Sequence, residues 1–278
     1  MKSSTLKRFA KRKSSVAGGV IIVFFILVAL VGPYFTSYDP LAINLPNKYQ
    51  NASLEHPLGT DNLGRDTLTR LVYGTRTTFY ISFTAVFSGS IVGLFLGVIA
   101  GYFGGKVDNA LMRATDVLLA FPGLLLAIAI VAILGNGIIN TIIAISIYNI
   151  PYIARIVRGS VLSIRNNEYV QAAKVIGASH TRIILTHIVP NSFSQVIVNT
   201  TLSLGTAILT SSSLSFLGLG VQPPHPEWGS MLSKAREVIR TVPIAALAPG
   251  FAITLVVLSF SLLGDGLRDA LDPRLKNS

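Results

Sequence analysis

Residues 168–190 read EYVQAAKVIGASHTRIILTHIVP, a polar and helix-prone stretch with a glycine in its middle and a proline at its end. The stretch lies between two long apolar runs, at about 138–157 and 192–219. A protein that only spans a membrane has no use for such an insert. We therefore expect a partner outside the membrane to contact it.

The composition of the whole chain is that of an integral membrane protein. Its 278 residues are 51% hydrophobic and only 13% charged, whereas a soluble domain carries about 25% charged residues. The mean hydropathy of +0.61 agrees with apolar runs that are too long for a soluble core. The sequence has no cysteine, which excludes a disulfide framework and a thiolate metal site.

Six apolar runs predict transmembrane helices rather than strands, because each is continuously apolar and reaches about 20 residues. The first run has no cleavage site of small residues after it, so we expect an uncleaved helix. The predicted spans are 16–35, 79–103, 112–134, 138–157, 192–219 and 243–264. The sequence thus predicts one all-α membrane domain, with a basic tail at 1–15, a first helix at 16–35, a loop at 36–78, a five-helix core at 79–264 that includes a polar loop at 165–190, and a tail at 265–278.

The distribution of charge predicts the orientation of the chain. Of the 23 Lys and Arg residues, 16 fall on the side of the two termini and the insert, and 7 fall on the other side. This asymmetry follows the positive-inside rule, so we expect the termini and the insert to be cytoplasmic. The net charge of +11 is then explained by the basic residues on the cytoplasmic side, and no nucleic-acid partner is expected.

The sequence gives no sign of catalysis. It contains no HExxH, no Gly-x-Ser-x-Gly and no phosphate-binding P-loop pattern. Asp116 is the clearest acid inside a span, and we expect it to pair with Arg113 three residues away. It has no second acid beside it in the membrane, so an intramembrane hydrolase is only a remote alternative. The lack of a chain of such acids also argues against a proton-driven carrier.

Two patterns concern the interior of the spans. Gly89, Gly93, Gly97 and Gly101 recur every four residues, which predicts close packing against another helix. The fifth span is rich in hydroxyl groups, which either bond to their own helix or line an aqueous path. The candidate residues for a translocation path are Asn149, Thr206, Thr210, Ser211 and Ser213.

The insert itself predicts two short helices. Gly177 is placed to end the first helix in the left-handed conformation, and 178–189 predicts a second. Two short helices joined at a glycine make a compact knob; the alternative is an amphipathic loop that lies on the membrane. One face of the first helix carries residues at i, i+3, i+4 and i+7, with small side chains at its centre, namely Tyr169, Ala172, Ala173 and Ile176.

The insert resembles the cytoplasmic EAA loop of ABC-importer permeases. That pattern is Glu-Ala-Ala, three residues, Gly, nine residues, and then Ile-x-Leu-Pro. Here the spacing agrees throughout, but Gln171 replaces the acid, His187 the Ile and Val189 the Leu. Glu168, three residues upstream on the same helical face, is the candidate to supply the missing charge.

Three further segments resemble one branch of this family, the second permease subunit of dipeptide, oligopeptide and nickel importers. They are HPLGTDNLGRD at 56–66, the SFLGLG and PEWG sequences within 215–229, and GDGLRD followed by Asp-Pro within 264–273. The matching segments extend over nearly the whole chain.

The resemblance implies a type I ABC-importer permease fold with a cytoplasmic coupling helix, in a bacterial cell membrane. It also implies a second homologous permease, two cytoplasmic ATPase subunits that bind ATP and magnesium, and an extracytoplasmic binding protein. No cofactor or metal is expected on this chain, which is surrounded by lipid. The implied cargo is a dipeptide or oligopeptide, and nickel or a metal chelate is the alternative. The implied ATPase-coupling residues are Glu168, Gln171, Ala172, Ala173, Gly177 and Arg182.

The 56–66 segment leaves two alternatives open. Its residues Asp61, Arg65 and Asp66 are typical of consecutive turns held together by acid–base pairs. In the alternative, they form an outer gate or the surface on which the binding protein docks.

Overall fold

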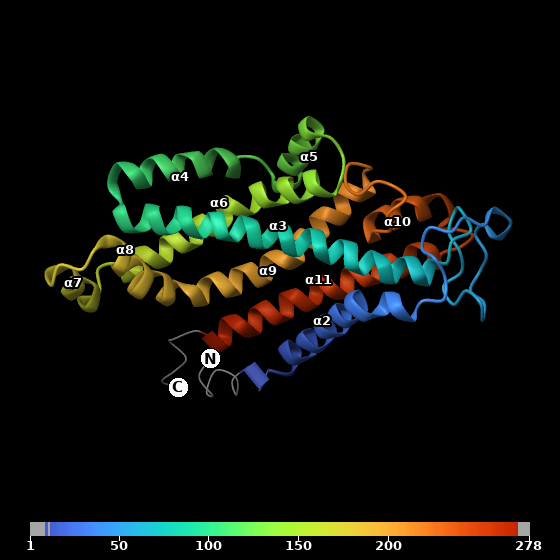
Figure 1. Ribbon diagram of the computed structural model, residues 1–278, viewed down its shortest axis with the longest axis horizontal. Coiled ribbons are helices and arrows are strands. Elements are labelled where there is room, and N and C mark those ends of the chain that lie inside the picture. Colours follow the sequence, from blue (N-terminus) through green and yellow to red (C-terminus); the bar gives the residue numbers. More distant parts are fainter. Residues whose placement is uncertain (1–8, 11, 272–278) are drawn as a thin grey trace.

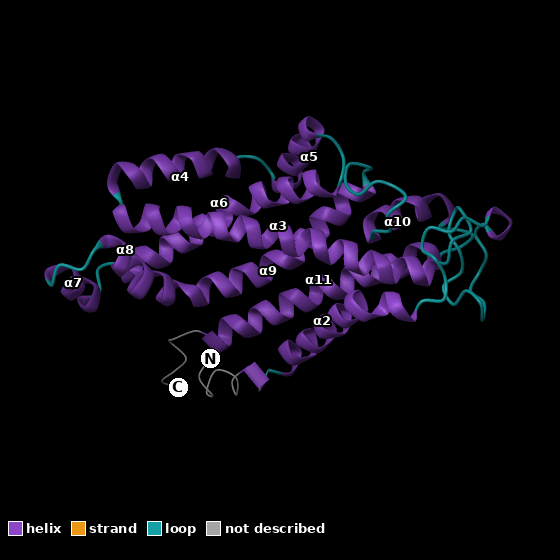
Figure 2. Cartoon of the chain, in the orientation of Figure 1, coloured by secondary structure: helices purple, strands orange, loops and turns teal. Residues whose placement is uncertain are grey.

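Helices form the regular structure of residues 9–10 and 12–271, the part of the chain that the computed structural model describes (Figure 2). The long helices run side by side (Figure 1). The loop 36–66 and α10 (Trp228–Ala235) lie at one end, here called the α10 end, and α7 (Glu168–Val175) lies at the other, the α7 end. The other α-helices are α2 (Lys13–Val31), α3 (Thr67–Phe103), α4 (Gly105–Leu119), α5 (Gly123–Leu134), α6 (Ile138–Ile164), α8 (His180–Ile183), α9 (Val189–Phe216) and α11 (Ile244–Leu271).

Short irregular helices complete the described part of the chain. Three are 3₁₀ helices, η1 (Gly32–Phe35), η2 (Leu45–Asn47) and η4 (Arg236–Val238). The fourth, η3 (Ile184–Ile188), is a π-helical turn that joins α8 to α9 without a break. This junction matters because it connects the polar insert directly to a membrane helix.

Within the described residues, five helical segments are long and apolar enough to cross a membrane, or six if the bent pair α4–α5 is counted as one span. The prediction of an all-α membrane protein is therefore confirmed. The five unbroken segments are Lys13–Phe35, Thr67–Phe103, Ile138–Ile164, His180–Phe216 and Ile244–Leu271.

The predicted third span, 112–134, is wrong as a continuous helix. The chain turns by 88° between α4 and α5. Pro122 lies at this turn, and proline both lacks an N–H donor and drives the residue before it out of the helical conformation. The 12 residues of α5 extend only about 18 Å, less than the roughly 30 Å of a hydrocarbon core.

Helix boundaries also differ from the predicted ones. The predicted loop 36–78 ends early, because α3 begins at Thr67, where the Asp66 carboxylate accepts a hydrogen bond from the Thr69 N–H at 2.7 Å. Similarly, α11 continues past residue 264 to Leu271. Hydropathy marks the apolar part of a helix, whereas capping decides where it begins. The predicted tails at 1–15 and 265–278 fall partly outside the described residues.

The glycine stripe of α3 packs against α6, as predicted. A Cβ atom at Gly89, Gly93 or Gly97 would lie 2.7, 2.8 or 2.5 Å from a backbone carbonyl oxygen of α6. Real Cβ atoms do not approach that closely, so only glycine allows this packing. The backbones of α3 and α6 therefore lie in direct contact along this stripe.

Two apolar clusters position the two ends of the bundle. One lies toward the α10 end, where Phe25 and Phe79 contact the Trp228 ring at centroid distances of 5.7 and 6.1 Å. The other joins α3, α6 and α9 near the α7 end and includes Val170, Ala173 and Ile183 of the insert. The insert is thus anchored to the membrane helices rather than lying loose.

Candidate functional site

The insert forms two short helices that project at the α7 end of the bundle (Figure 1). We call residues 165–190 the α7–α8 loop. The first helix is α7, and the second is α8, which continues through η3 into α9. Any displacement of α8 is consequently passed to a membrane-spanning helix without an intervening flexible segment.

Gly177 ends α7 in the conformation that the sequence predicted. Its φ is +82°, its N–H donates to the Lys174 carbonyl at 3.0 Å, and the Ala178 N–H donates to the Ala173 carbonyl at 3.0 Å. These two bonds define a Schellman motif. No atom lies within 4 Å of a Cβ placed on Gly177, so the positive φ rather than lack of space selects glycine.

Ala173 does not lie on an exposed contact surface, and this corrects the predicted stripe. It is 7% exposed and packs with Val170 and Ile183 in the cluster that joins the loop to the membrane helices. A helix of only eight residues is unstable alone and needs such an apolar anchor. Ala172, by contrast, is exposed.

The most exposed apolar residues of the loop are Val175 and Ile176, at 86% and 83%. They form a tip directly before Gly177; Ile176 belongs to the predicted face of the first helix, whereas the sequence interpretation did not select Val175. Adjacent residues on a helix point in different directions, so one neighbouring helix of the same chain cannot cover both side chains. Exposed apolar groups that adjoin charged side chains are typical of a protein contact. Three charged or polar groups of the same loop are also exposed, namely Glu168, Gln171 and Arg182.

Hydrogen bonds attach the loop to the ends of α3 and α6. The Tyr102 hydroxyl of α3 lies 2.9 Å from His180 Nδ1 at the start of α8. Gln171 Nε2 donates to the Arg165 carbonyl at 3.1 Å, and Arg165 Nη1 donates to the Gly101 carbonyl at 3.0 Å. The loop therefore contacts both members of the α3–α6 pair.

Asp116 pairs with Arg155 of α6 at 2.5 Å, so the predicted partner Arg113 is wrong. The correction follows from the turn at Pro122, because α4 lies beside α6 instead of continuing across the membrane. Asp108 of α4 also binds Arg158 through two contacts of 2.5 and 2.7 Å. Two ion pairs thus hold α4 on α6.

The hydroxyl-rich face of α9 is partly open. Thr206 is exposed, and Thr210 and Ser213 are half-buried on the same face, at i+4 and i+7. Each hydroxyl also bonds to a carbonyl of its own helix. In contrast, Asn149 and Ser211 are buried, and this corrects their selection as path residues. Asn149 Nδ2 donates to the Val86 carbonyl at 3.3 Å and so joins α6 to α3.

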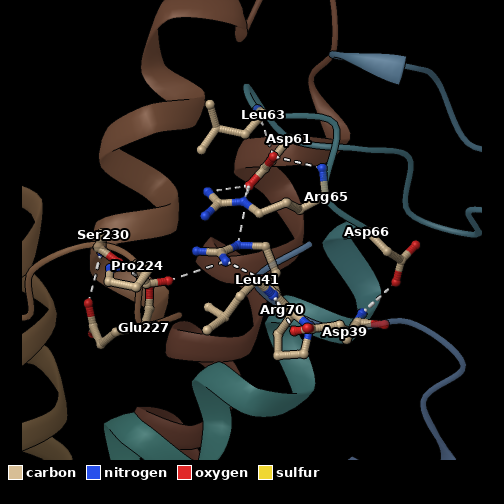
Figure 3. Close-up of polar contacts among 12 residues, drawn as sticks. Asp39, Leu41, Asp61, Leu63, Arg65, Asp66, Arg70, Pro224, Glu227 and Ser230 are labelled. Carbon is tan, nitrogen blue, oxygen red and sulfur yellow. Dashed lines mark hydrogen bonds and ion pairs between the residues drawn. The ribbon is translucent and has the colours of Figure 1, made fainter. Parts of the chain in front are cut away.

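At the α10 end, the 56–70 segment buries a set of charged groups (Figure 3). The Asp61 carboxylate accepts a hydrogen bond from Arg65 Nε at 2.8 Å and forms an ion pair with Arg70 Nε, 3.2 Å away. Asp66 caps α3 and lies 2.9 Å from His56 Nδ1. Arg65 and Asp66 are buried, so they do not form a docking surface in this chain. The geometry agrees instead with turns held by acid–base pairs, and it adds Arg70, which the sequence interpretation had missed.

Glu227 is a second buried acid at this end, with no exposed surface. Its carboxylate accepts a hydrogen bond from the Ser230 N–H at 2.8 Å and so caps α10 (Figure 3). Ser212 of α9 donates to it at 3.4 Å. Burial raises the pKa of Glu227, since a charged carboxylate is poorly solvated there. This residue joins α10 to the end of α9.

Comparison with known families gives two matches along the chain. Residues 93–277 match the family described as binding-protein-dependent transport system inner membrane component. Residues 3–53 match the N-terminal transmembrane domain of oligopeptide transport permease C. Between them, the two matches include the first helix and everything from the middle of α3 onward.

Individual relatives are similar over almost the whole chain. The dipeptide transport system permease protein DppC of Alkalihalophilus pseudofirmus is 50% identical over 271 residues, which cover 98% of this chain and 89% of the relative. The glutathione transport system permease protein GsiD of Pectobacterium atrosepticum is 44% identical over 272 residues, which cover 98% and 90%.

Solved structures share the fold at low sequence identity. An inward-facing structure of the MetNI methionine ABC transporter aligns with a TM-score of 0.60 at 20% identity, over 73% of this chain and 97% of that one. An amino acid ABC transporter crystallised with histidines aligns with a TM-score of 0.55 at 17% identity, over 71% and 92%. The type I ABC-importer fold expected from the sequence is thereby confirmed.

Proposed function

The chain belongs to the family of binding-protein-dependent transport system inner membrane components, and we propose that its cargo is a dipeptide or another short peptide. It is a membrane-spanning permease of an ABC importer. The support for peptide cargo is the 50% and 44% identity to a dipeptide permease and to a permease for glutathione, itself a tripeptide. Nickel or a metal chelate is the alternative, and neither relative points to it.

We place the α7 end in the cytoplasm and the α10 end outside. Two observations support this orientation. The side that carries the α7–α8 loop holds 16 of the 23 Lys and Arg residues, as the positive-inside rule requires. The first turn of α2 and the last turn of α11 point toward the same side (Figure 1), and Arg12 pairs there with Asp269.

The α7–α8 loop is the proposed contact with a cytoplasmic ATPase subunit, which would bind ATP and magnesium. The observation that carries this proposal is the apolar tip formed by Val175 and Ile176 on a loop that is otherwise anchored to the membrane helices. Glu168, Gln171, Ala172 and Arg182 are exposed on the same loop. Gly177 shapes the loop, and Ala173 holds it in place rather than touching the partner.

ATP binding can move the permease only if the ATPase subunits bind two arrangements of the membrane helices with different affinity. In the proposed mechanism, closure of the nucleotide sites displaces α7 and α8 as one body. The displacement passes through η3 to α9 and through the Tyr102–His180 contact to α3. Thr206, Thr210 and Ser213 of α9 then line the path on the face toward a second, homologous permease.

The test compares Val175→Asp with Ile176→Asp in the complete transporter, reconstituted with its ATPase subunits and binding protein in liposomes. Each change places a charge in an apolar contact. We expect co-purification of the ATPase subunits and peptide uptake to fall by about tenfold or more, with an unchanged amount of chain in the membrane.

Leu54→Asp is the matched control. Leu54 is a fully exposed apolar residue at the α10 end, so the same substitution there leaves the ATPase subunits bound. Full uptake by both tip variants would overturn the coupling assignment. Uptake of labelled nickel, but not of labelled dipeptide or glutathione, by the unmodified transporter would overturn the peptide assignment.

A further inference from the structure

A cavity of about 350 Å³ lies at the α10 end, beside the buried charges of the 61–70 segment. It is lined mainly by that segment, the end of α9, the stretch 221–225 and α10. Its volume falls at the lower end of the roughly 300–1,000 Å³ typical of small-molecule sites. The lining residues on which the argument rests are Asp61, Asn62, Arg65, Arg70 and Lys234.

Positive charge exceeds negative charge in the lining. Asp61 is the one acid among the described lining residues, whereas the lining holds the three cations Arg65, Arg70 and Lys234. One Asp61 oxygen accepts the backbone N–H groups of Leu63 and Arg65, and the other accepts both guanidinium groups. A single carboxylate therefore neutralises two buried arginines, although buried charges ordinarily need one opposite charge each.

Arg70 carries the excess charge. Its side chain is 6% exposed, and its other contacts are neutral, with Nη1 donating to the Pro40 carbonyl at 2.6 Å and to the Pro224 carbonyl at 3.5 Å (Figure 3). Arg70 also lies in the first turn of α3, where the helix dipole adds positive potential. An anion in the cavity would supply the missing opposite charge, and a guanidinium binds a carboxylate well.

Asn62 gives a second and independent sign of a ligand. Its Oδ1 atom is buried and has no hydrogen-bond partner. A buried acceptor without a partner is unfavourable by about 1–3 kcal/mol in general, so such atoms usually meet a ligand or water. Since Asn62 lines the same cavity as Arg70, an unpaired acceptor stands beside an excess of positive charge.

We propose that this cavity binds the carboxylate end of a short peptide. Arg70 binds the carboxylate, Lys234 at the exposed edge attracts it, and the Asn62 side chain accepts a hydrogen bond from a peptide N–H. The proposal rests on the proposed function for the choice of a peptide as the anion. It assigns to the permease a peptide subsite of its own, separate from the binding protein.

The experiment uses the assembled permease pair with its ATPase subunits in lipid nanodiscs, without the binding protein. Equilibrium dialysis measures the affinity for labelled Ala-Ala and for Ala-Ala amide, which lacks the carboxylate. We expect the free acid to bind about tenfold more tightly than the amide, because a hydrogen bond to a charged group is lost in the amide. Equal affinities would overturn the proposal.

Three variants locate the site. Arg70→Gln should weaken Ala-Ala binding about tenfold, and Lys234→Gln about threefold, while both leave amide binding unchanged. Asn62→Leu should weaken the acid and the amide alike, by about fivefold. Arg76→Gln is the matched control, because Arg76 is an exposed cation of the same helix that lies outside the cavity.

Arg70 also holds two loop carbonyls, so Asn62→Leu and Lys234→Gln decide between a binding role and a structural one. Replacing an unpaired buried oxygen by an apolar group does not destabilise the chain. Unchanged affinities in these two variants would overturn the proposal even if Arg70→Gln lost binding.

Peptide uptake by the unmodified transporter, measured with its binding protein, separates the hypothesis of a peptide subsite from the hypothesis of a peptide cargo. If uptake is present but acid and amide bind equally, only the subsite is wrong; if peptide uptake is absent, the proposed cargo is wrong.

Discussion

The α10 end of the bundle buries Arg65, Asp66 and Arg70, with Asp61 half-buried beside them, whereas the α7 end leaves Glu168, Lys174 and Arg182 exposed. At the α10 end, charged groups fix loops against one another through paired hydrogen bonds. At the α7 end, small or branched apolar residues anchor the loop, and its charged groups are exposed. The first construction resists change of shape. The second is anchored through its apolar side chains and leaves its polar surface exposed.

The largest effect is expected at the α10 end, from Asp61→Ala. The substitution leaves Arg65 and Arg70 buried without an opposite charge, which destabilises a protein by roughly 3–5 kcal/mol. We expect a clear fall in the thermal unfolding temperature of the detergent-solubilised chain. Glu55→Ala is the control, since Glu55 is an exposed acid of the same loop and its removal should change little. Equal stability of the two variants would mean that the α10 end is not held by its buried charges.

An intermediate effect is expected from Gly177→Ala at the α7 end. A residue with a Cβ in the left-handed conformation is strained by about 1–2 kcal/mol. The amides of α7 should therefore exchange hydrogen roughly 5- to 30-fold faster, while the membrane helices keep their protection. Gly177→Asn is the matched variant, because asparagine tolerates this conformation, and it should exchange more slowly than Gly177→Ala. Protection that does not depend on the residue at 177 would show that the loop is not held by its Schellman motif.

The smallest effect is expected from Tyr102→Phe, which removes one hydrogen bond between α3 and α8. The loss is about 1 kcal/mol, so exchange in residues 178–184 should rise roughly fivefold. Tyr169→Phe serves for comparison, because the contact of its ring with His187 at 5.9 Å does not need the hydroxyl. If both substitutions have the same effect, the Tyr102 hydroxyl does not hold the loop.

The features that depend on local sequence were predictable. Apolar length decides which segments enter the membrane, and the glycine spacing of α3 decides which of its faces can approach another helix closely. Gly177 was predictable for the same reason, because a left-handed residue after a helix is a property of a few neighbouring residues.

The features that depend on long-range packing were not predictable from a single chain. The position of Pro122 indicates a break, but only packing places α4 beside α6, and this placement gives Asp116 the partner Arg155 instead of Arg113. Likewise, the spacing of Ala172 and Ala173 cannot tell which of them faces Val170 and Ile183. Asn149 and Ser211 resemble path residues in composition, and their burial between helices is decided by neighbours far away in sequence.

The length of α3 has a mechanical consequence. Its 37 residues extend about 55 Å, so the helix is longer than the roughly 30 Å of a hydrocarbon core. Arg70 lies near one tip of this rod and Tyr102 near the other, about 48 Å apart along the axis. A tilt of about 5° around its midpoint moves each tip by about 2 Å in opposite directions. Such a tilt would shift the Arg70 wall of the cation-lined cavity at one end as the Tyr102 contact with the loop shifts at the other, with no change in the helix itself.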